Sequence, residues 1–127
     1  MIHAGPPAAI VIGVGRYHER VPTRQEAVVV SSVARLFRSL GDPTRLAILL
    51  ALIDGERRVA DVVELVGTSQ PNVSGHLACL KECGLVVDRP AERRQVFYRI
   101  ARPEVHDVLR AADRLVAELG PAIQACR

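Results

Sequence analysis

Residues 68–86 read TSQPNVSGHLACLKECGLV, and this segment indicates the fold more clearly than any other part of the chain. Ser69 is a favourable helix cap, because a serine hydroxyl accepts a hydrogen bond from the amides of a first helical turn. A helix is predicted from about Gln70 to Cys83, and Gly84 is a typical residue to close it. A short apolar helix comes before it and stops at Gly67. Two short helices joined by a tight turn that contains glycine are typical of a helix-turn-helix.

The second of these helices has one apolar face and one small, polar face. Val73, Leu77 and Leu80 share a side at helical pitch, which predicts that they are core residues. Small residues on the opposite side would let the backbone enter the major groove of duplex DNA, where Gln, Ser and Asn can reach base edges. An ordinary solvated helix has a similar pattern. The residues predicted to contact DNA are Ser69, Gln70, Asn72, Ser74, Gly75 and Lys81, together with Arg93 and Arg94 further along the chain.

Two more helices are predicted before this motif. Residues 24–40 carry apolar side chains at helical spacing, and Gly41 ends that helix. Asp42 and Pro43 start the next one, since Asp is a favoured N-cap and Pro a favoured first helical residue. Residues 54–55, Asp-Gly, break it.

After Gly84 the apolar period changes from helical to extended. Residues 85–87 and 96–100 are β-prone runs with a charged segment between them, which predicts a hairpin, or wing, with Arg93 and Arg94 at its tip. A last helix is predicted from near Pro103 to Gly120. The predicted fold class is therefore mainly α with a small β-hairpin, a winged helix-turn-helix in the order α-α-α-α-β-β-α.

The chain length and composition suit one globular domain. It has 127 residues, of which 49% are hydrophobic and 24% charged. Residues 1–23, rich in Pro and Gly, are predicted to be a flexible arm, residues 24–120 the DNA-binding and dimerisation domain, and residues 121–127 a tail. No apolar run reaches the roughly 18–20 residues of a membrane helix. We therefore expect a cytoplasmic protein with no membrane partner.

The positive charge is concentrated around the motif. Residues 69–102 hold six basic and three acidic side chains, an excess equal to the net charge of +3 of the whole chain. All the basic residues except Lys81 are arginines, whose forked donors suit phosphates and guanine edges. Aromatic residues make up only 3%, too few for the stacking platforms that bind single strands. Double-stranded operator DNA is the expected partner, although a solvated basic face would carry the same charge.

The first and last predicted helices carry apolar stripes that the small central motif cannot fully cover. Packing against a second copy would bury these stripes and place two DNA-reading helices about one turn of DNA apart. We therefore expect a homodimer on a roughly palindromic operator.

Three cysteines in a chain expected to be cytosolic do not make a disulfide framework. Cys79 and Cys83 lie one helical turn apart, so both thiols can bind one metal ion, and His76 sits on the same side. Cys126 in the tail could add a third sulfur, from its own chain or from its partner. Three sulfurs favour soft ions such as Cd(II), Pb(II) or As(III), whereas Zn(II) usually takes a fourth ligand. Cysteines that are simply small core residues would have the same spacing.

Three segments carry a resemblance to a known family. These are residues 40–50 (LGDPTRLAILL), residues 68–86 and residues 94–99 (RQVFYR). Through them the chain resembles the ArsR/SmtB family of metalloregulatory repressors over roughly residues 25–120. The resemblance implies a dimeric winged-helix repressor that leaves its operator when an inducer binds.

The resemblance also indicates which family sites to expect. An arsenic or cadmium site with a Cys-x-Cys pair would fall near residues 58–61, but the sequence there is RVAD. A zinc, nickel or cobalt site in the last helix is matched by Glu104 and His106, but Ala117 and Gly120 stand where later ligands are expected. Neither of these two sites is predicted in this chain.

The cysteine pattern matches the CmtR-type cadmium/lead sensors of that family, which carry Cys-x-x-x-Cys in the DNA-reading helix and a further C-terminal cysteine. The match implies Cys79, Cys83 and Cys126 as ligands, Cd(II) or Pb(II) as the inducer, and no organic cofactor. The predicted function is a repressor that binds operator DNA as an apo dimer and leaves it on metal binding. The alternatives are a regulator that responds to As(III), Zn(II) or thiol oxidation, and a winged-helix regulator without a metal site. No set of nucleophile, base and orienting residue emerges, so no enzyme is expected.

Overall fold

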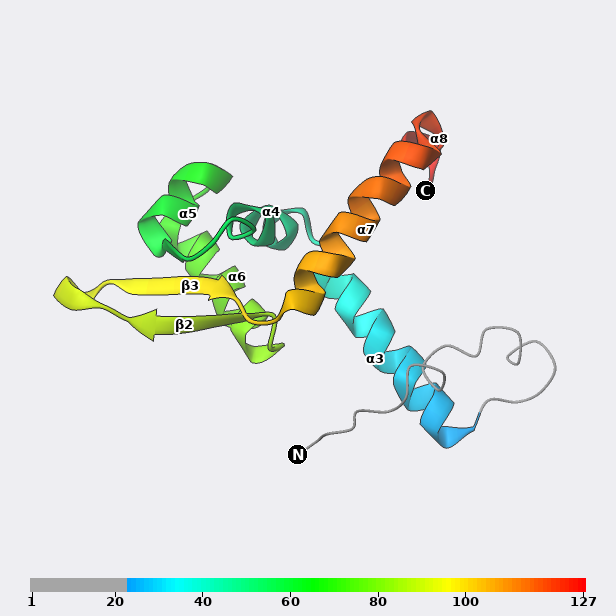
Figure 1. Ribbon diagram of the computed structural model, residues 1–127, viewed down its shortest axis with the longest axis horizontal. Helices are drawn as coiled ribbons and strands as arrows, with labels where there is room; N and C mark the ends of the chain where they lie inside the picture. The colour runs from blue at the N-terminus through cyan, green and yellow to red at the C-terminus, as the bar shows by residue number, and fades with distance from the viewer. Residues whose placement is uncertain (1–22) are drawn as a thin grey trace. The chain divides into compact units, whose positions relative to one another are not determined.

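The computed structural model describes residues 23–127 and divides into two compact units, one ending at Asp42 and one from Pro43 to Arg127. The arm predicted over residues 1–23 lies outside the described residues except for its last position. The first unit contains α3 (Arg24–Leu40). The second contains α4 (Pro43–Ala51), β1 (Arg57–Arg58), α5 (Val59–Val66), α6 (Gln70–Glu82), β2 (Val86–Pro90), the short 3-10 helix η1 (Glu92–Arg94), β3 (Val96–Ile100), α7 (Pro103–Leu119) and α8 (Pro121–Ala125) (Figure 1).

Helix α3 has the bounds that the sequence predicts, because its first turn closes with a capping box. The Thr23 hydroxyl accepts a hydrogen bond from the Glu26 amide at 3.1 Å, and the Glu26 carboxylate accepts one from the Thr23 amide at 2.7 Å. Val30 and Phe37 remain 49% and 59% exposed on this helix. Part of its apolar stripe is thus exposed to solvent.

The core of the second unit lies among α4, α5 and α6, which pack on one another. Val73, Leu77 and Leu80 of α6 are completely buried, as the sequence predicts. They meet apolar side chains of α4, α5 and the loop after α4, and each buried side chain of this size contributes about 1.5–3 kcal/mol. Gly67 closes α5 in the left-handed region at φ +81°, a conformation that glycine adopts without strain. The buried apolar side chains of α4, of the loop after it and of α5 are Ile48, Leu49, Leu52 and Val62.

The wing is part of an antiparallel sheet in the order β1-β3-β2. Val86 lies opposite Ile100, and both side chains are buried. The sequence predicted a hairpin of two strands, and the third strand, β1, was missed. It has only two residues, Arg57 and Arg58, so it is too short to show alternation in the sequence.

The wing tip turns at Arg93 and Arg94, as predicted. The Gln95 amide donates to the Glu92 carbonyl at 3.2 Å, and the two residues between them have φ of 61° and 60°. A turn with both central residues at positive φ matches the twist of a hairpin, but Asn and Gly adopt it more easily than Arg. The tip therefore carries two arginines in a backbone conformation that disfavours them.

Helix α7 begins at Pro103 and ends before Gly120, as predicted. Its first turns bury Val105 and Leu109, whereas Leu115 and Val116 near its end are 58% and 47% exposed. The segment after it, predicted as a plain tail, contains the short helix α8. The break at Gly120 is followed by a proline, whose fixed φ favours a new first helical turn. No helix among the described residues is long and apolar enough to span a bilayer.

Candidate DNA interface and thiol site

The N-terminal end of α6 presents a low, polar surface. The Ser69 hydroxyl caps the helix by accepting from the Asn72 amide at 3.3 Å, and the Asn72 side chain donates to the Thr68 hydroxyl at 3.1 Å. The side-chain amide of Gln70 donates to the Ser74 hydroxyl at 2.7 Å. These bonds hold short donors and acceptors in place along the edge of the helix that faces solvent.

Gly75 lies on the same exposed surface, and a Cβ atom added there would meet nothing within 4 Å. The fold therefore does not require glycine at this position. No acidic residue occurs in the first turn of α6, so nothing there repels a phosphate backbone. The predicted DNA-contact residues of this helix end thus share one accessible, uncharged patch.

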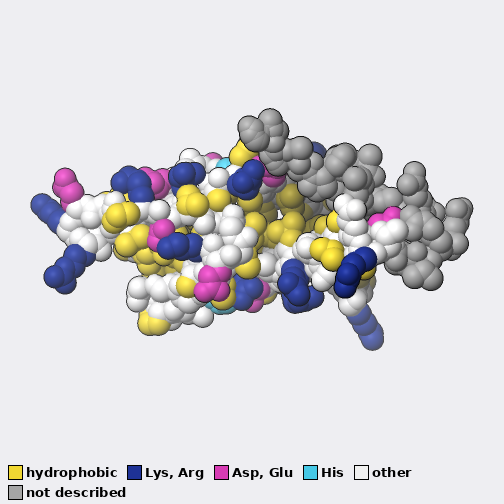
Figure 2. Space-filling model, turned by 90° about the horizontal axis from the view of Figure 1, so that it is seen from below, with side chains coloured by type: hydrophobic (Ala, Val, Ile, Leu, Met, Phe, Trp, Pro, Cys, Tyr) yellow, Lys and Arg dark blue, Asp and Glu magenta, His cyan; other side chains and the backbone are white. Residues whose placement is uncertain are grey.

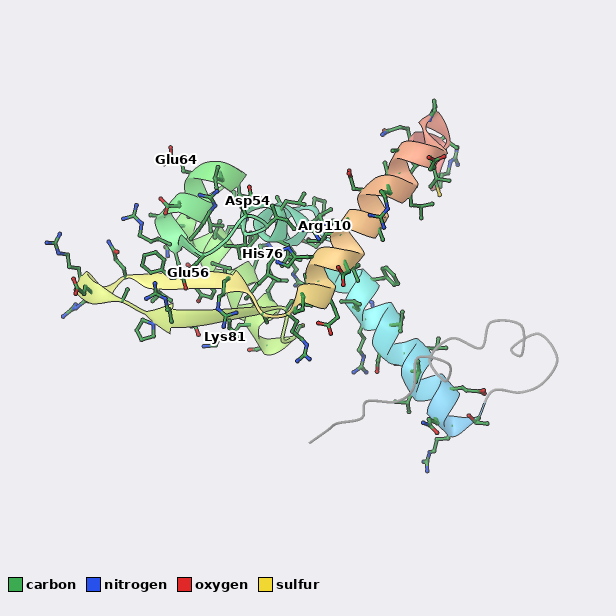
Figure 3. The ribbon with its side chains drawn as sticks, in the orientation of Figure 1. Asp54, Glu56, Glu64, His76, Lys81 and Arg110 are labelled. Atoms are coloured by element: carbon green, nitrogen blue, oxygen red, sulfur yellow. The ribbon has the colours of Figure 1, made fainter. Side chains whose placement is uncertain are left out.

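The basic residues of the wing fall into two groups, those that are paired and those that are not. Arg89 donates to both oxygens of Glu56, at 2.8 and 2.6 Å, and its guanidinium lies 4.7 Å from the centre of the Phe97 ring. The hydrogen bond from Arg89 lowers the pKa of Glu56 and raises that of Arg89. Glu56 lies beside the wing strands in Figure 3.

By contrast, Arg93 and Arg94 form no ion pair with any described residue. Both are exposed at the wing tip, and Figure 2 shows Lys and Arg side chains at that end of the molecule. Cationic groups without a protein partner are the ones available to neutralise phosphates. The prediction that these two arginines contact DNA therefore fits their surroundings.

Lys81 lies nearer the C-terminal end of α6 and is already paired. Its Nζ lies 3.0 Å from an Asp88 carboxylate oxygen, and this hydrogen bond raises the pKa of Lys81 (Figure 3). The pair joins α6 to strand β2. Contact between Lys81 and DNA stays a prediction, and it would compete with this bond.

His76 connects α6 to the first helix of the unit. The Arg45 Nε donates to His76 Nδ1 at 3.3 Å, across the interface between α4 and α6 (Figure 3). One ring nitrogen of this histidine is therefore engaged by α4. The contact was not foreseen, since the two residues lie 31 positions apart in the chain.

Cys79 and Cys83 stand one turn apart at the C-terminal end of α6. Cys79 is half-buried and Cys83 is exposed, and the Cys83 amide donates to the Cys79 carbonyl at 3.0 Å as the helix closes. Cys126 is exposed after α8, and all three are free thiols. Within residues 23–127 no group of three His, Cys, Asp or Glu side chains could hold a metal ion. One protomer therefore offers two thiols together, and Cys126 does not join them.

At the positions of the two family sites that the sequence lacks, the structure has ion pairs between ordinary charged side chains. Arg58 donates to both oxygens of Asp61, at 3.2 and 3.0 Å, where a Cys-x-Cys pair would otherwise fall. Glu104 lies 3.6 Å from the Arg102 guanidinium at the start of α7. The cysteines of α6 thus remain the sulfur donors closest to the DNA-reading surface.

Comparison with known proteins identifies the family. The model of the bacterial regulatory protein arsR family matches residues 42–87, which cover α4, α5, α6 and the start of the wing. A probable mercury resistance operon repressor of Streptomyces lividans is 42% identical over 95 residues, 75% of each chain. The chain belongs to the ArsR family. The described relatives of this family are DNA-binding transcriptional regulators rather than enzymes, in agreement with the sequence prediction.

Two further relatives resemble this ArsR-family chain in sequence and in fold. The transcriptional regulator CmtR of Mycobacterium tuberculosis is 49% identical over 71 residues, which cover 56% of this chain and 59% of CmtR. A homodimeric winged helix-turn-helix domain from Mycobacterium bovis, solved by NMR, aligns with a TM-score of 0.65 and 32% identity, over 78% of this chain and 90% of that one. The winged helix-turn-helix fold predicted from the sequence is thereby confirmed.

Proposed function

We propose that this ArsR-family chain is a homodimeric repressor that binds operator DNA without metal and releases it when Cys79, Cys83 and Cys126 bind Cd(II) or Pb(II). The observation that carries the proposal is the thiol pair at the C-terminal end of the helix whose other end presents the DNA-contact patch. CmtR, a relative of this chain, is described as a cadmium metal sensor in its NMR structure.

The donor chemistry fits a soft divalent ion. Thiolates bind Cd(II) and Pb(II) more strongly than they bind hard ions such as Mg(II). Cys83 is exposed and Cys79 partly so, which leaves both sulfurs accessible to an incoming ion. A bound ion would neutralise the thiolate charge and fix the positions of its ligands.

Dimerisation supplies the missing third ligand in this proposal. Cys126 lies beyond the end of α7 and away from α6 in its own chain (Figure 1). The exposed apolar residues of α7 are suited to packing against a second copy, which would bring a second C-terminal segment into the assembly. We therefore assign the third sulfur to Cys126 of the partner protomer.

Release of DNA follows from the position of the thiols on α6. Besides its buried face, the helix is held through His76 to α4 and through Lys81 to β2, so contacts in the half that carries the thiols help to set its orientation. Tying Cys79 and Cys83 to a C-terminal segment adds a competing restraint at that half. Two ligands that favour different orientations of one helix are coupled by a few kcal/mol at most.

The test is a titration of the reduced protein with Cd(II), followed in the ultraviolet by the thiolate-to-metal charge-transfer band. Cys79→Ser and Cys83→Ser should each weaken Cd(II) binding by more than the ~10–100-fold that loss of an outer-shell partner costs. Binding should weaken as the pH falls, because the ligands must lose protons. Glu82→Gln, which keeps all three thiols and alters the neighbour of Cys83, is the matched control. A band unchanged in Cys79→Ser would refute the assignment.

The origin of the third sulfur is tested with mixed dimers. Neither Cys126→Ser nor the double variant Cys79→Ser/Cys83→Ser should form a complete site alone. Mixed together, they form heterodimers that contain one complete site if Cys126 acts across the dimer. Recovery of about half the wild-type band in the purified heterodimer supports the assignment, and no recovery contradicts it. Operator release measured with Cd(II), Pb(II), Zn(II), As(III) and peroxide then selects the inducer.

A further inference from the structure

A hollow of about 360 Å³ opens where the start of α5, the start of α6 and the wing converge. Its walls come from segments far apart in the sequence: Arg58, Val59, Ala60, Gln70, Ser74, Arg94, Gln95, Val96 and Tyr98. Gln70 and Ser74 belong to the DNA-contact patch, and Arg94 belongs to the wing tip. The hollow therefore joins the two predicted DNA-contact regions.

The side chains around this hollow are suited to an oxyanion. Arg58 and Arg94 supply two cationic groups, and Gln70, Ser74 and Tyr98 supply neutral polar atoms. No Asp or Glu is among the described residues that line it. Forked guanidinium groups with nearby amide and hydroxyl donors are the usual protein ligands of a phosphate.

Arg58 is held at the hollow by an acidic residue just outside it. Asp61 takes hydrogen bonds from Nε and Nη2 of Arg58, and these bonds raise the pKa of Arg58 and lower that of Asp61. Nη1 of Arg58 has no hydrogen bond within the described part of the chain. Asp61 thus orients the guanidinium and at the same time neutralises part of its charge.

Arg94 reaches the hollow from a strained turn. Its φ of 60° and that of Arg93, 61°, lie in the left-handed region, which costs roughly 1–2 kcal/mol for each residue with a side chain. Strain of this kind persists in proteins where a functional side chain must be placed. The wing tip retains it although Asn and Gly would fit the same turn without it.

We propose that this hollow binds a backbone phosphate of the operator duplex, with Arg58 and Arg94 as its cationic contacts and Asp61 as an internal competitor that weakens the contact. The inference rests on the proposed DNA-binding function and extends it to Arg58, which the sequence did not assign. A phosphate here is flanked by the residues that reach base edges and by the wing. The contact fixes the register of the protein on DNA and carries no base preference of its own.

Because Asp61 competes with a phosphate for Arg58, substitutions of the two residues should change DNA affinity in opposite directions. Asp61→Asn removes the negative charge beside Arg58 and should raise DNA affinity, by the same factor for operator and for unrelated duplexes. Arg58→Ala should lower both affinities by a common factor. Each lost phosphate contact reduces the slope of log affinity against log salt by about 0.9, so a dimer should lose about 1.8. A residue that merely stabilises the fold would not raise affinity when its partner is removed.

The experiment measures binding of the full-length protein to fluorescent operator and unrelated duplexes at several salt concentrations between about 50 and 200 mM. Arg99→Ala is the matched control, since it removes an arginine from β3 that does not line the hollow, and its salt slope should equal that of the wild type. Arg58→Gln removes the positive charge but keeps a long polar side chain, so it should lose the same slope and serves as the second variant should Arg58→Ala unfold.

Three results would overturn the inference: an unchanged salt slope in both Arg58 variants, no gain in affinity in Asp61→Asn, or a change confined to the operator. Inorganic phosphate that binds the wild type and not Arg58→Ala, with an unchanged DNA slope, would assign the hollow to a free anion instead and also overturn it. Failure of the wild type to bind any duplex would refute the proposed function itself, which is a separate outcome.

Discussion

The two ends of α6 carry different chemistries on one helix. At the N-terminal end the side chains are short, uncharged and hydrogen-bonded among themselves, as in the bond from Gln70 to Ser74. From its middle to its C-terminal end they connect to other elements, through His76 to α4 and through Lys81 to β2. The thiols of Cys79 and Cys83 occur only at this second end.

This difference shows how one helix can serve two ligands without their sites overlapping. Helix α6 has 13 residues and is therefore roughly 20 Å long. Its buried side, with Leu77 at its middle, is shared by both ends and makes the helix move as one body. DNA affinity should therefore depend directly on the side chains at the N-terminal end of α6. The orientation of the helix should depend on the contacts of its C-terminal half.

The largest effect is expected for Gly75→Leu, which tests whether the N-terminal end of α6 binds DNA independently of the end that carries the thiols. Gly75 is exposed, an added Cβ would meet nothing within 4 Å, and Leu is favoured over Gly in a helix by about 0.5–1 kcal/mol, so thermal stability should not fall. A bulky residue on the groove-facing surface should displace several base contacts worth about 1–3 kcal/mol each, which lowers operator affinity by roughly 100-fold or more.

Fluorescence anisotropy with the operator measures this effect, and the Cd(II) charge-transfer titration shows whether the other end is intact. Glu82→Leu, which places the same side chain at the C-terminal end of α6, is the control and should not weaken operator binding. If both variants lose DNA binding equally, the two ends are not functionally distinct.

A second prediction concerns the wing tip and tests whether residues outside α6 also contact DNA. The double variant Arg93→Asn/Arg94→Gly suits a turn with positive φ. It should raise the free energy of unfolding by about 1–2 kcal/mol in total, less than the full strain of two residues, because Asn keeps a Cβ and Gly loses more backbone entropy on folding. It should also lower operator affinity and reduce the salt slope, because two cationic contacts are lost. Urea denaturation and salt-dependent binding measure the two effects.

The control Arg93→Lys/Arg94→Lys keeps both the positive charge and the strained backbone. It should therefore change the free energy of unfolding and the DNA affinity only slightly. Loss of stability in the Asn/Gly variant would mean that the positive φ values are not a source of strain. Unaltered DNA binding would exclude the tip from the interface.

The smallest effect is expected at the Glu56–Arg89 pair, which belongs to neither end of α6. Because Arg89 lowers the pKa of Glu56 below its ordinary value of 4.5, the pair stabilises the fold above that pH, and its contribution is lost as the pH falls through the lowered value. Melting temperatures of the wild type and Glu56→Gln should differ slightly and constantly from pH 6 to pH 8. The difference should decrease only below pH 4.5 and vanish as the pH falls through the lowered pKa of Glu56. A difference that vanishes at neutral pH would contradict this origin.

Much of the fold was predictable because it depends on local signals. The bounds of α3 follow from the Thr23 capping box, those of α6 from the Ser69 cap, and its buried face from the spacing of Val73, Leu77 and Leu80. Strand β1 and helix α8 were not predicted. The first is too short to show a period, and the second depends on Pro121 restarting a helix after the break at Gly120.

Local sequence signals are enough to predict the helix-turn-helix, the wing, the polar surface of α6 and the spacing of Cys79 and Cys83, since all of these depend on residues close in the chain. Which charges are available depends instead on tertiary contacts. The tertiary structure paired Lys81 with Asp88 and Arg89 with Glu56, left Arg93 and Arg94 at the wing tip without an ion pair among the described residues, and brought Arg58 to the same hollow as Gln70. These pairings join segments up to 33 residues apart, and the packing of the sheet against the helices sets them.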